Sequence, residues 1–157
     1  MSIITPYIEN LNRLKKEIPS KAKEIITENA IYILSVIKYE QLALGTDYLG
    51  NDIGDNEYAY STEHFYAKVS PKPRKPKVTG SNYNMEWTGQ FFDGLAIKTE
   101  DDGYNIFSKN GKKEFLEGIY GTKLTIFTKE HNDHINNTIL LPNLYKYLLD
   151  NLLRVKR

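Results

Sequence analysis

The chain contains no cysteine, which excludes disulfide bonds, thiolate nucleophiles and zinc sites built from cysteine ligands. No stretch approaches the roughly 20 apolar residues that a membrane-spanning helix needs. The first residues also lack a basic leader followed by an apolar run. We therefore expect no membrane partner, and a protein that is made or assembled in the cytoplasm.

Neither sign of charge dominates, because 21 Lys and Arg stand against 20 Asp and Glu, a formal net charge of +1. This balance gives no whole-protein attraction to nucleic acid or anionic membranes, so any such preference must come from a local patch. Hydrophobic residues make up 40% of the 157 residues, enough for one core and one domain over residues 1–157. The twelve tyrosines fit either the codon usage of an AT-rich genome or an enrichment at interfaces.

Catalytic and nucleotide-binding motifs are missing as well. The sequence has no GxxxxGKS/T, no GxGxxG after a strand and no serine nucleophile in an elbow. The densest group of potential ligands is KEHNDHIN, but its HxxH spacing differs from the HExxH of zinc hydrolases, and the asparagines around it favour a solvated loop. Its ligands would be Glu130, His131, Asp133 and His134. We expect no enzyme activity, no metal and no cofactor.

The first 44 residues carry the clearest helical pattern. Thr5 and Pro6 are typical of an N-cap and a first helical position. Apolar residues recur at helical spacing on both sides of Pro19, where we expect an interruption or a kink. The pattern predicts one long helix over residues 5–44 with a buried face, ended by Gly45. The apolar positions include Ile8, Leu11, Leu14, Ile18, Ala22, Ile25, Ile26, Ile33, Leu34 and Ile37.

The rest of the chain mixes strand and helix patterns. YAYSTEHFYAKV, YNMEWTG, LAIKT, YNIFS and KLTIFT predict four or five short strands within residues 56–128, with a hairpin at Asp102-Gly103. KKEFLEGIYG predicts a short helix with Phe115, Leu116 and Ile119 on one face, and Pro142 is placed to begin a C-terminal helix over residues 142–154. The predicted fold is α+β, with the N-terminal and C-terminal helices packed on an antiparallel sheet of about four strands.

Residues 45–61, GTDYLGNDIGDNEYAYS, raise the question of a calcium loop. With Asp47 as the first ligand, the third position is Leu49 and the twelfth is Tyr58 instead of glutamate, so the calcium pattern fails. We interpret the segment as a turn that Ile53 pins to the core, with glycines where the backbone turns tightly. The glycines predicted at structural turns are Gly45, Gly50, Gly54, Gly89 and Gly121.

The segment AKVSPKPRKPKVTGSN concentrates positive charge. Its prolines hold the backbone extended and remove ladder donors, so we expect an exposed extended loop over residues 68–80. Two interpretations stay open, a soluble connection and a surface that docks on an acidic protein or on DNA through salt-dependent contacts. The basic residues are Lys68, Lys72, Arg74, Lys75 and Lys77.

Several short motifs follow one another along the chain. The long helix, the glycine-rich turn, a tyrosine-rich strand and the basic loop precede EWTGQFFDGLAIK, IYGTKLTIFT and a last helix. This order, with Thr88-Gly89 before a central strand and Tyr120-Gly121 after a later segment, resembles small neck and tail-completion proteins of tailed bacteriophages. The spacing of Gly45, Asp47, Gly50 and Ile53 is most similar to versions from phages of Bacteroidetes hosts, such as crAss-like phages.

The resemblance implies a non-enzymatic virion protein of the neck or tail. Such proteins form a homo-oligomeric ring of six or twelve copies that joins portal, adaptor or tail ring proteins and continues the DNA channel. The basic loop would then meet a neighbouring protein or DNA in the lumen. Candidate subunit contacts are Tyr48, Tyr58, Tyr60, Phe65 and Tyr66. The alternative function is a small DNA-binding module that uses residues 68–77.

Overall fold

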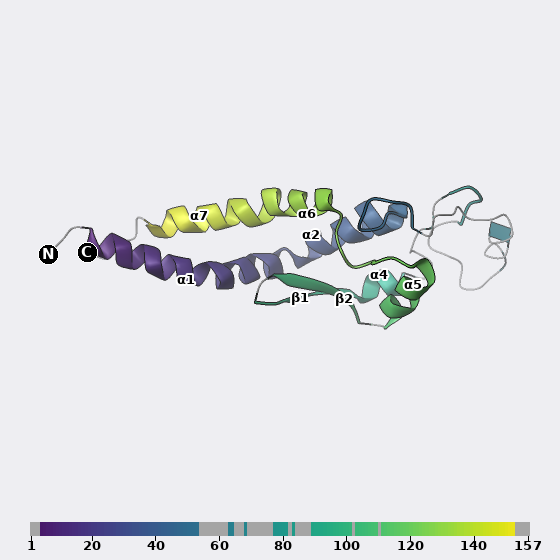
Figure 1. The fold of residues 1–157 in the computed structure, drawn as a ribbon, viewed down its shortest axis with the longest axis horizontal. Coiled ribbons are helices and arrows are strands. Elements are labelled where there is room, and N and C mark those ends of the chain that lie inside the picture. Colours follow the sequence, from purple (N-terminus) through teal and green to yellow (C-terminus); the bar gives the residue numbers. More distant parts are fainter. Residues whose placement is uncertain are drawn as a thin grey trace.

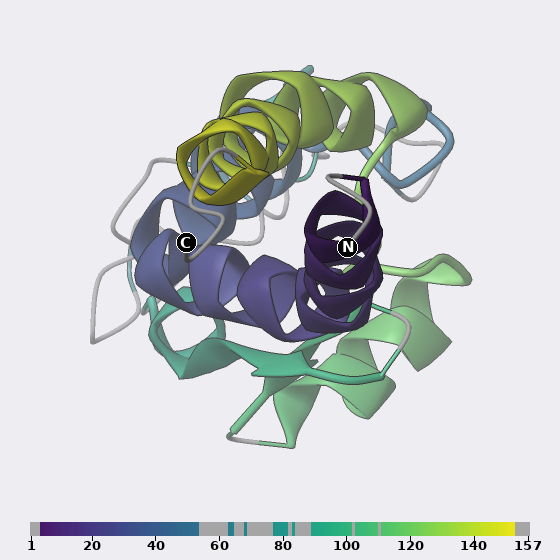
Figure 2. The same ribbon diagram turned by 90° about the vertical axis from the view of Figure 1, so that its left-hand side faces the viewer.

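A computed structural model describes residues 4–53, 63–64, 68, 77–81, 83, 89–101, 103–109 and 111–152. The described chain is elongated, with two long helical runs side by side and a β-hairpin layered against the first of them (Figures 1 and 2). The first run leads away from the N-terminus and the second returns beside it in the opposite direction. The fold is therefore mixed helix and sheet, as the α+β prediction states, but mostly helical.

The first helical run covers the predicted range of residues 5–44 in four pieces, α1 Thr5–Glu28, α2 Ala30–Ser35, the π-helix η1 Val36–Gln41 and the 3-10 helix η2 Leu42–Leu44. Pro19 lies inside α1 without ending it, and the break comes at Asn29 instead. Thr5 is not the cap, because Ile4 takes that position without a side-chain bond. Gly45 follows η2 in the left-handed conformation, with φ of 78°.

The sheet of the described residues has two antiparallel strands, β1 Leu95–Thr99 and β2 Tyr104–Ser108, with Ile97 opposite Ile106. The hairpin prediction is confirmed, and the prediction of about four strands is wrong. Its clearest failure is KLTIFT, residues 123–128, which bends at residues 124–126 and belongs to no ladder. The side chain of Gln41 donates to Ile126 O at 2.9 Å and accepts from Thr128 N at 3.1 Å, so an amide side chain satisfies the groups that a strand partner would bind.

The second helical run comprises α6 Lys129–Ile135, the π-helix η3 Asn136–Leu140 and α7 Leu141–Leu152. The loop predicted for KEHNDHIN is therefore wrong: Thr128 caps α6 by accepting from His131 N at 3.1 Å. The predicted C-terminal helix is present as α7, with Pro142 as its second residue, but it continues a helical run instead of beginning one. Proline has no N–H, so the backbone hydrogen bonds of the helix lose one donor at this point. The change from α-helical to π-helical hydrogen bonding in η3 lies next to that missing donor.

Two short helices complete the body of the fold, α4 Gln90–Gly94 and α5 Lys112–Tyr120. The prediction of α5 and of its end at Gly121, with φ of 64°, is confirmed. Of its predicted apolar face, Leu116 packs on the core with Tyr120, whereas Phe115 and Ile119 are 67% and 58% exposed.

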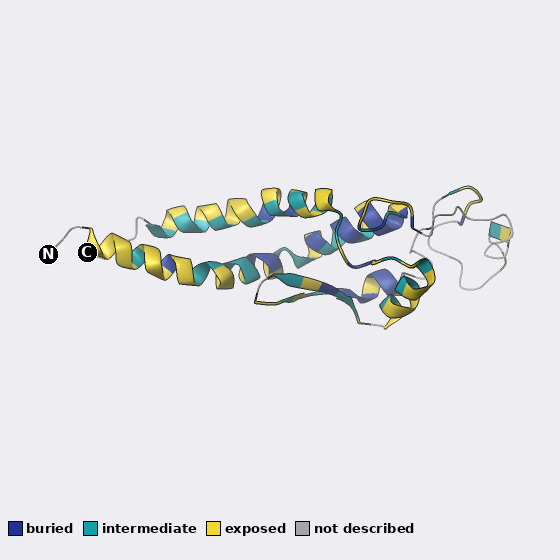
Figure 3. Cartoon of the chain, viewed as in Figure 1, coloured by how far each residue is buried: buried dark blue, intermediate teal, exposed yellow. Residues whose placement is uncertain are grey.

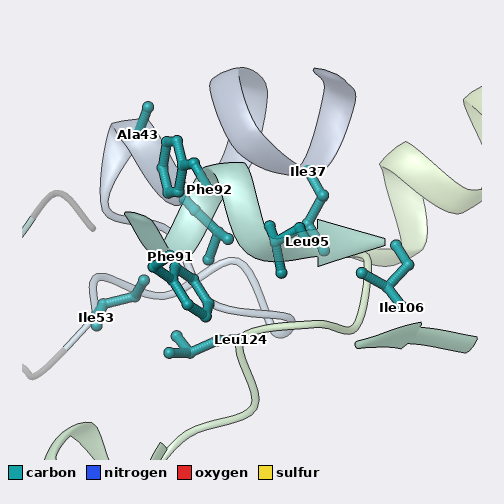
Figure 4. Close-up of a cluster of buried hydrophobic side chains, with 9 residues drawn as sticks. Ile37, Ala43, Ile53, Phe91, Phe92, Leu95, Ile106 and Leu124 are labelled. Atoms are coloured by element: carbon teal, nitrogen blue, oxygen red, sulfur yellow. The ribbon is translucent and has the colours of Figure 1, made fainter. Parts of the chain in front are cut away.

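Two buried clusters hold the body together. In the first, Phe91 and Phe92 of α4 lie among side chains from η2, the loop after it, β1, β2 and the 123–128 segment (Figure 4). In the second, Ile25 and Ile26 of α1 meet α2, α6 and η3, with side chains of the hairpin packed against them. Burial is concentrated where the hairpin, α2, η1 and α4 lie, whereas the free end of α1 is mostly exposed and that of α7 mixes exposed and half-buried residues (Figure 3).

Candidate interaction surface

Two of the five basic loop residues fall within the described chain. Lys68 is exposed, but Lys77 is only 5% exposed, so the prediction of an exposed loop is wrong at that position. Nearby, the backbone N–H of Thr79 donates to the Glu63 carboxylate at 2.7 Å, and the Thr79 hydroxyl donates to the same oxygen. These bonds hold the pKa of Glu63 below its usual value. Lys72, Arg74 and Lys75 lie outside the described residues.

Only one of the five predicted aromatic contacts falls within the described chain. Tyr48 is half-buried, whereas Tyr58, Tyr60, Phe65 and Tyr66 lie outside the described residues, as does Gly54. Tyr48 borders a hollow of about 400 Å³ with residues of α5 and the turn after it, including Gly118 and Gly121.

The glycine-rich turn is organised by Asp47. Its carboxylate accepts from Leu49 N and Asn51 N at 2.9 Å each and from the Thr122 hydroxyl at 3.0 Å. Ile53, which is 1% exposed, fixes the other end of the turn in the core. The Asp47 carboxylate is thus occupied by protein donors, which is the arrangement of an Asx-type turn.

The two histidines of α6 contact different side chains. The Nδ1 atom of His131 lies 3.3 Å from Oε1 of buried Gln41, and Nε2 of His134 lies 2.8 Å from the Tyr32 hydroxyl. Asp133 pairs with Lys129. Within the described ranges, no group of three His, Asp or Glu side chains is placed to hold a metal ion.

A groove of about 860 Å³ runs between α1, the tip of the hairpin, the 125–127 segment and the α6–η3 run. Two of its cationic groups are paired, Lys23 with Asp101 at 2.8 Å and Lys129 with Asp133 at 2.7 Å. Tyr104 lines the groove, and its buried hydroxyl has no hydrogen-bond partner among the described residues. Burial raises the pKa of that hydroxyl, so Tyr104 stays protonated near neutral pH.

Beyond the body, the cap Ile4, the first part of α1 (residues 5–18) and α7 form a projection, which we call the arm (Figure 1). Polar contacts join its two helices: the Asn10 amide donates to the carbonyls of Asn151 and Leu152, and the Tyr147 hydroxyl donates to Glu17 at 2.5 Å. The Tyr147 bond, with a smaller contribution from Arg13, lowers the pKa of Glu17, and the same bond raises the pKa of Tyr147. Leu14 is the fully buried apolar residue of this junction.

The arm also carries an uncovered apolar surface, which we call the arm face. On α1 its members follow at helical spacing, and on α7 they stand four residues apart. Each is between 47% and 66% exposed. They are Ile4, Tyr7, Ile8 and Leu11 on α1, and Leu141, Tyr145 and Leu149 on α7.

The two halves of the arm face point to the same side. On α1 they lie on average about 120° further round the helix than the contact residues Asn10 and Glu17, counted at 3.6 residues per turn. On α7 they lie on average about 140° further round than Tyr147 and Asn151, in the same sense. Because both helices are right-handed and run antiparallel, similar displacements in one sense place both stripes on the same side of the pair.

The sequence contained a signal for part of this surface. The apolar stripe predicted for the first helix runs from Ile8 through Ile26, and we expected all of it to be buried. Its second half is covered by the hairpin and the η3 run, and Leu14 is also buried, but Ile8 and Leu11 are not covered. Helical periodicity identifies residues that share a face, whereas the presence of a covering element depends on tertiary structure.

Comparisons of the chain with protein-family models, with curated proteins and with solved structures gave no significant match. Among the described residues, no helix has the length and apolar character required to span a membrane.

Proposed function

We propose that the chain is a structural protein of the virion, a subunit of a ring in the neck or tail of a tailed bacteriophage. The ring would join portal or adaptor to tail and continue the DNA channel. The observation that carries this proposal is the arm face, because a large exposed apolar surface on a soluble chain is typical of a site that another protein covers.

The chemistry of the described residues supports an assembly role over a catalytic one. The ionisable side chains with clear partners form structural contacts, such as Asp47 in its turn and Glu17 between the arm helices. The order of sequence motifs supplies the link to neck and tail-completion proteins.

The proposal is tested in the phage that encodes the chain. Mass spectrometry of purified particles is expected to find the protein, and deletion of its gene is expected to give DNA-filled heads that lack functional tails. Electron microscopy and plaque counts measure both effects. Infectious particles of normal morphology from the deletion strain would contradict the proposal.

A further inference from the structure

The area of the arm face is large enough for a specific protein contact. Seven side chains that each expose about half or more of their surface offer on the order of 700 Å², close to the roughly 800 Å² per partner of a standard interface. The largest apolar patch of a typical monomer is about 300–600 Å². The arm face therefore has the size and composition of one half of an interface.

A second exposed apolar surface lies on α5, near the end of the long axis opposite to the arm tip (Figure 1). Phe115 and Ile119 stand one turn apart on its outer side. We call these two residues, with the neighbouring hollow at Gly118, the α5 patch. The helix presents this side rigidly, because Leu116 packs on the core and Glu117 accepts from Leu124 N at 2.9 Å.

Gly118 supplies an independent indication that something approaches α5. Glycine inside a helix weakens that helix relative to alanine. A Cβ atom at Gly118 would meet nothing within 4 Å, so no contact within the chain requires glycine here. The missing side chain instead deepens the hollow beside Tyr48, which suits a side chain inserted by another molecule.

We infer that the arm face of one copy packs against the α5 patch of a second copy, and that a side chain of the arm face enters the hollow at Gly118. This inference rests on the proposed ring function for its closure. Two different patches at opposite ends of an elongated subunit generate a head-to-tail contact, which closes into a ring when the rotation between subunits permits it. An arm-to-arm contact would end in a dimer and would leave the α5 patch uncovered.

The chain has no native cysteine, so introduced cysteines are unique reporters. Lys15 lies one turn beyond Leu11 at the edge of the arm face, and Lys123 lines the hollow by α5. We expect a short bismaleimide to join Lys15→Cys and Lys123→Cys proteins when they are mixed at millimolar concentration. The double variant is expected to give a ladder of covalent oligomers in gel electrophoresis, because the linker traps even transient head-to-tail contacts.

The matched control is Lys16→Cys, whose side chain lies about 100° away from that of Lys15, off the arm face. It is expected to give no product with Lys123→Cys. Dimers from Lys15→Cys alone would show an arm-to-arm contact and overturn the inference. A mixed yield no greater than that of the Lys16→Cys control would also overturn it, and would point to a different protein as the occupant of the arm face.

A glycine substitution separates the interface role from a structural role. Gly118→Ala is expected to raise the melting temperature of the chain by about 2 °C while it lowers the cross-linking yield several-fold. Gly103→Ala is the control, because a Cβ atom there also meets nothing within 4 Å and Gly103 lies in the hairpin turn, away from α5. An unchanged yield in Gly118→Ala would contradict the use of the hollow. All these measurements use the purified chain, so their failure is distinguishable from absence of the protein in virions.

Discussion

Ile25 and Ile8 belong to one apolar stripe of α1, yet Ile25 is 2% exposed and Ile8 is 51% exposed. In the body, the hairpin and the η3 run pack over the stripe. In the arm, α7 contacts the neighbouring side of α1 through bonds from Asn10 and Tyr147, and leaves Ile8 and Leu11 of the stripe open. The same residue type on one broad apolar stripe thus serves folding in the body and remains available for association in the arm.

The largest effect is expected in the body. Ile25→Ala removes a side chain enclosed by the second core cluster and leaves a cavity, which costs about 2–5 kcal/mol of the free energy of unfolding. Urea denaturation followed by circular dichroism measures the change. A loss below about 1 kcal/mol would mean that the two halves of the stripe do not differ in the way that their exposure indicates.

A second large effect is expected at Gln41, which is fully buried and binds three groups of the 126–131 segment. Gln41→Ala leaves Ile126 O and Thr128 N without their partner, and we expect a loss of about 2–4 kcal/mol. Exposed Gln90→Ala is the matched control and is expected to change stability by less than about 0.5 kcal/mol. Equal effects of the two substitutions would show that the amide does not replace a strand partner.

Gln41 also illustrates what the sequence did and did not predict about the fold. Local signals were sufficient for the hairpin at Asp102-Gly103 and for the end of the first helical run at Gly45, because turn and cap residues act over a few positions. The strand predicted for KLTIFT failed because its partner is a side chain 85 residues earlier in the chain. The α6 helix was missed because the asparagines around KEHNDHIN favoured a loop, whereas the cap that begins the helix, Thr128, was assigned to that strand.

The interruption expected at Pro19 did not occur, because the surroundings of the proline also matter. The proline removes one helical donor, but residues 15 and 19 are both exposed, so water can satisfy the carbonyl that loses its partner. The candidate interaction surface was also only partly predictable, because it too depends on tertiary structure. The sequence showed which apolar residues share a face of α1, but the covering of that face depends on long-range packing, and the residues chosen from aromatic and basic composition lie mostly outside the described chain.

A smaller effect is expected at the polar junction of the arm. The folded-state pKa of Glu17 is lowered by Tyr147, so the bond favours the folded state above the unfolded glutamate pKa, near 4.3 in model peptides. That contribution is lost as pH falls from this value through the lower folded pKa. Tyr147→Phe should therefore lower the melting temperature at pH 6 and have less effect at pH 3.

The Tyr147 prediction has a direct check in the titration of Glu17. The carboxyl pKa, followed by NMR, is expected to move upward toward its ordinary value in Tyr147→Phe, and Tyr145→Phe serves as the control on the exposed side of α7. An unchanged Glu17 pKa would show that the arm helices are not held by this bond in solution.

The smallest effect on stability is expected in the arm face itself. Ile8→Ala removes little buried area, and alanine has the higher helix propensity, so the free energy of unfolding should change by less than about 0.5 kcal/mol in either direction. The same substitution removes apolar area from the proposed contact, and we therefore expect sedimentation velocity at high concentration to show weaker self-association. Ile25→Ala has the opposite profile, a large loss of stability from a residue that no second copy can reach. If Ile8→Ala instead destabilised the isolated chain as strongly as Ile25→Ala, the arm face would be buried by the chain's own residues in solution, and the distinction between the two halves of α1 would fail.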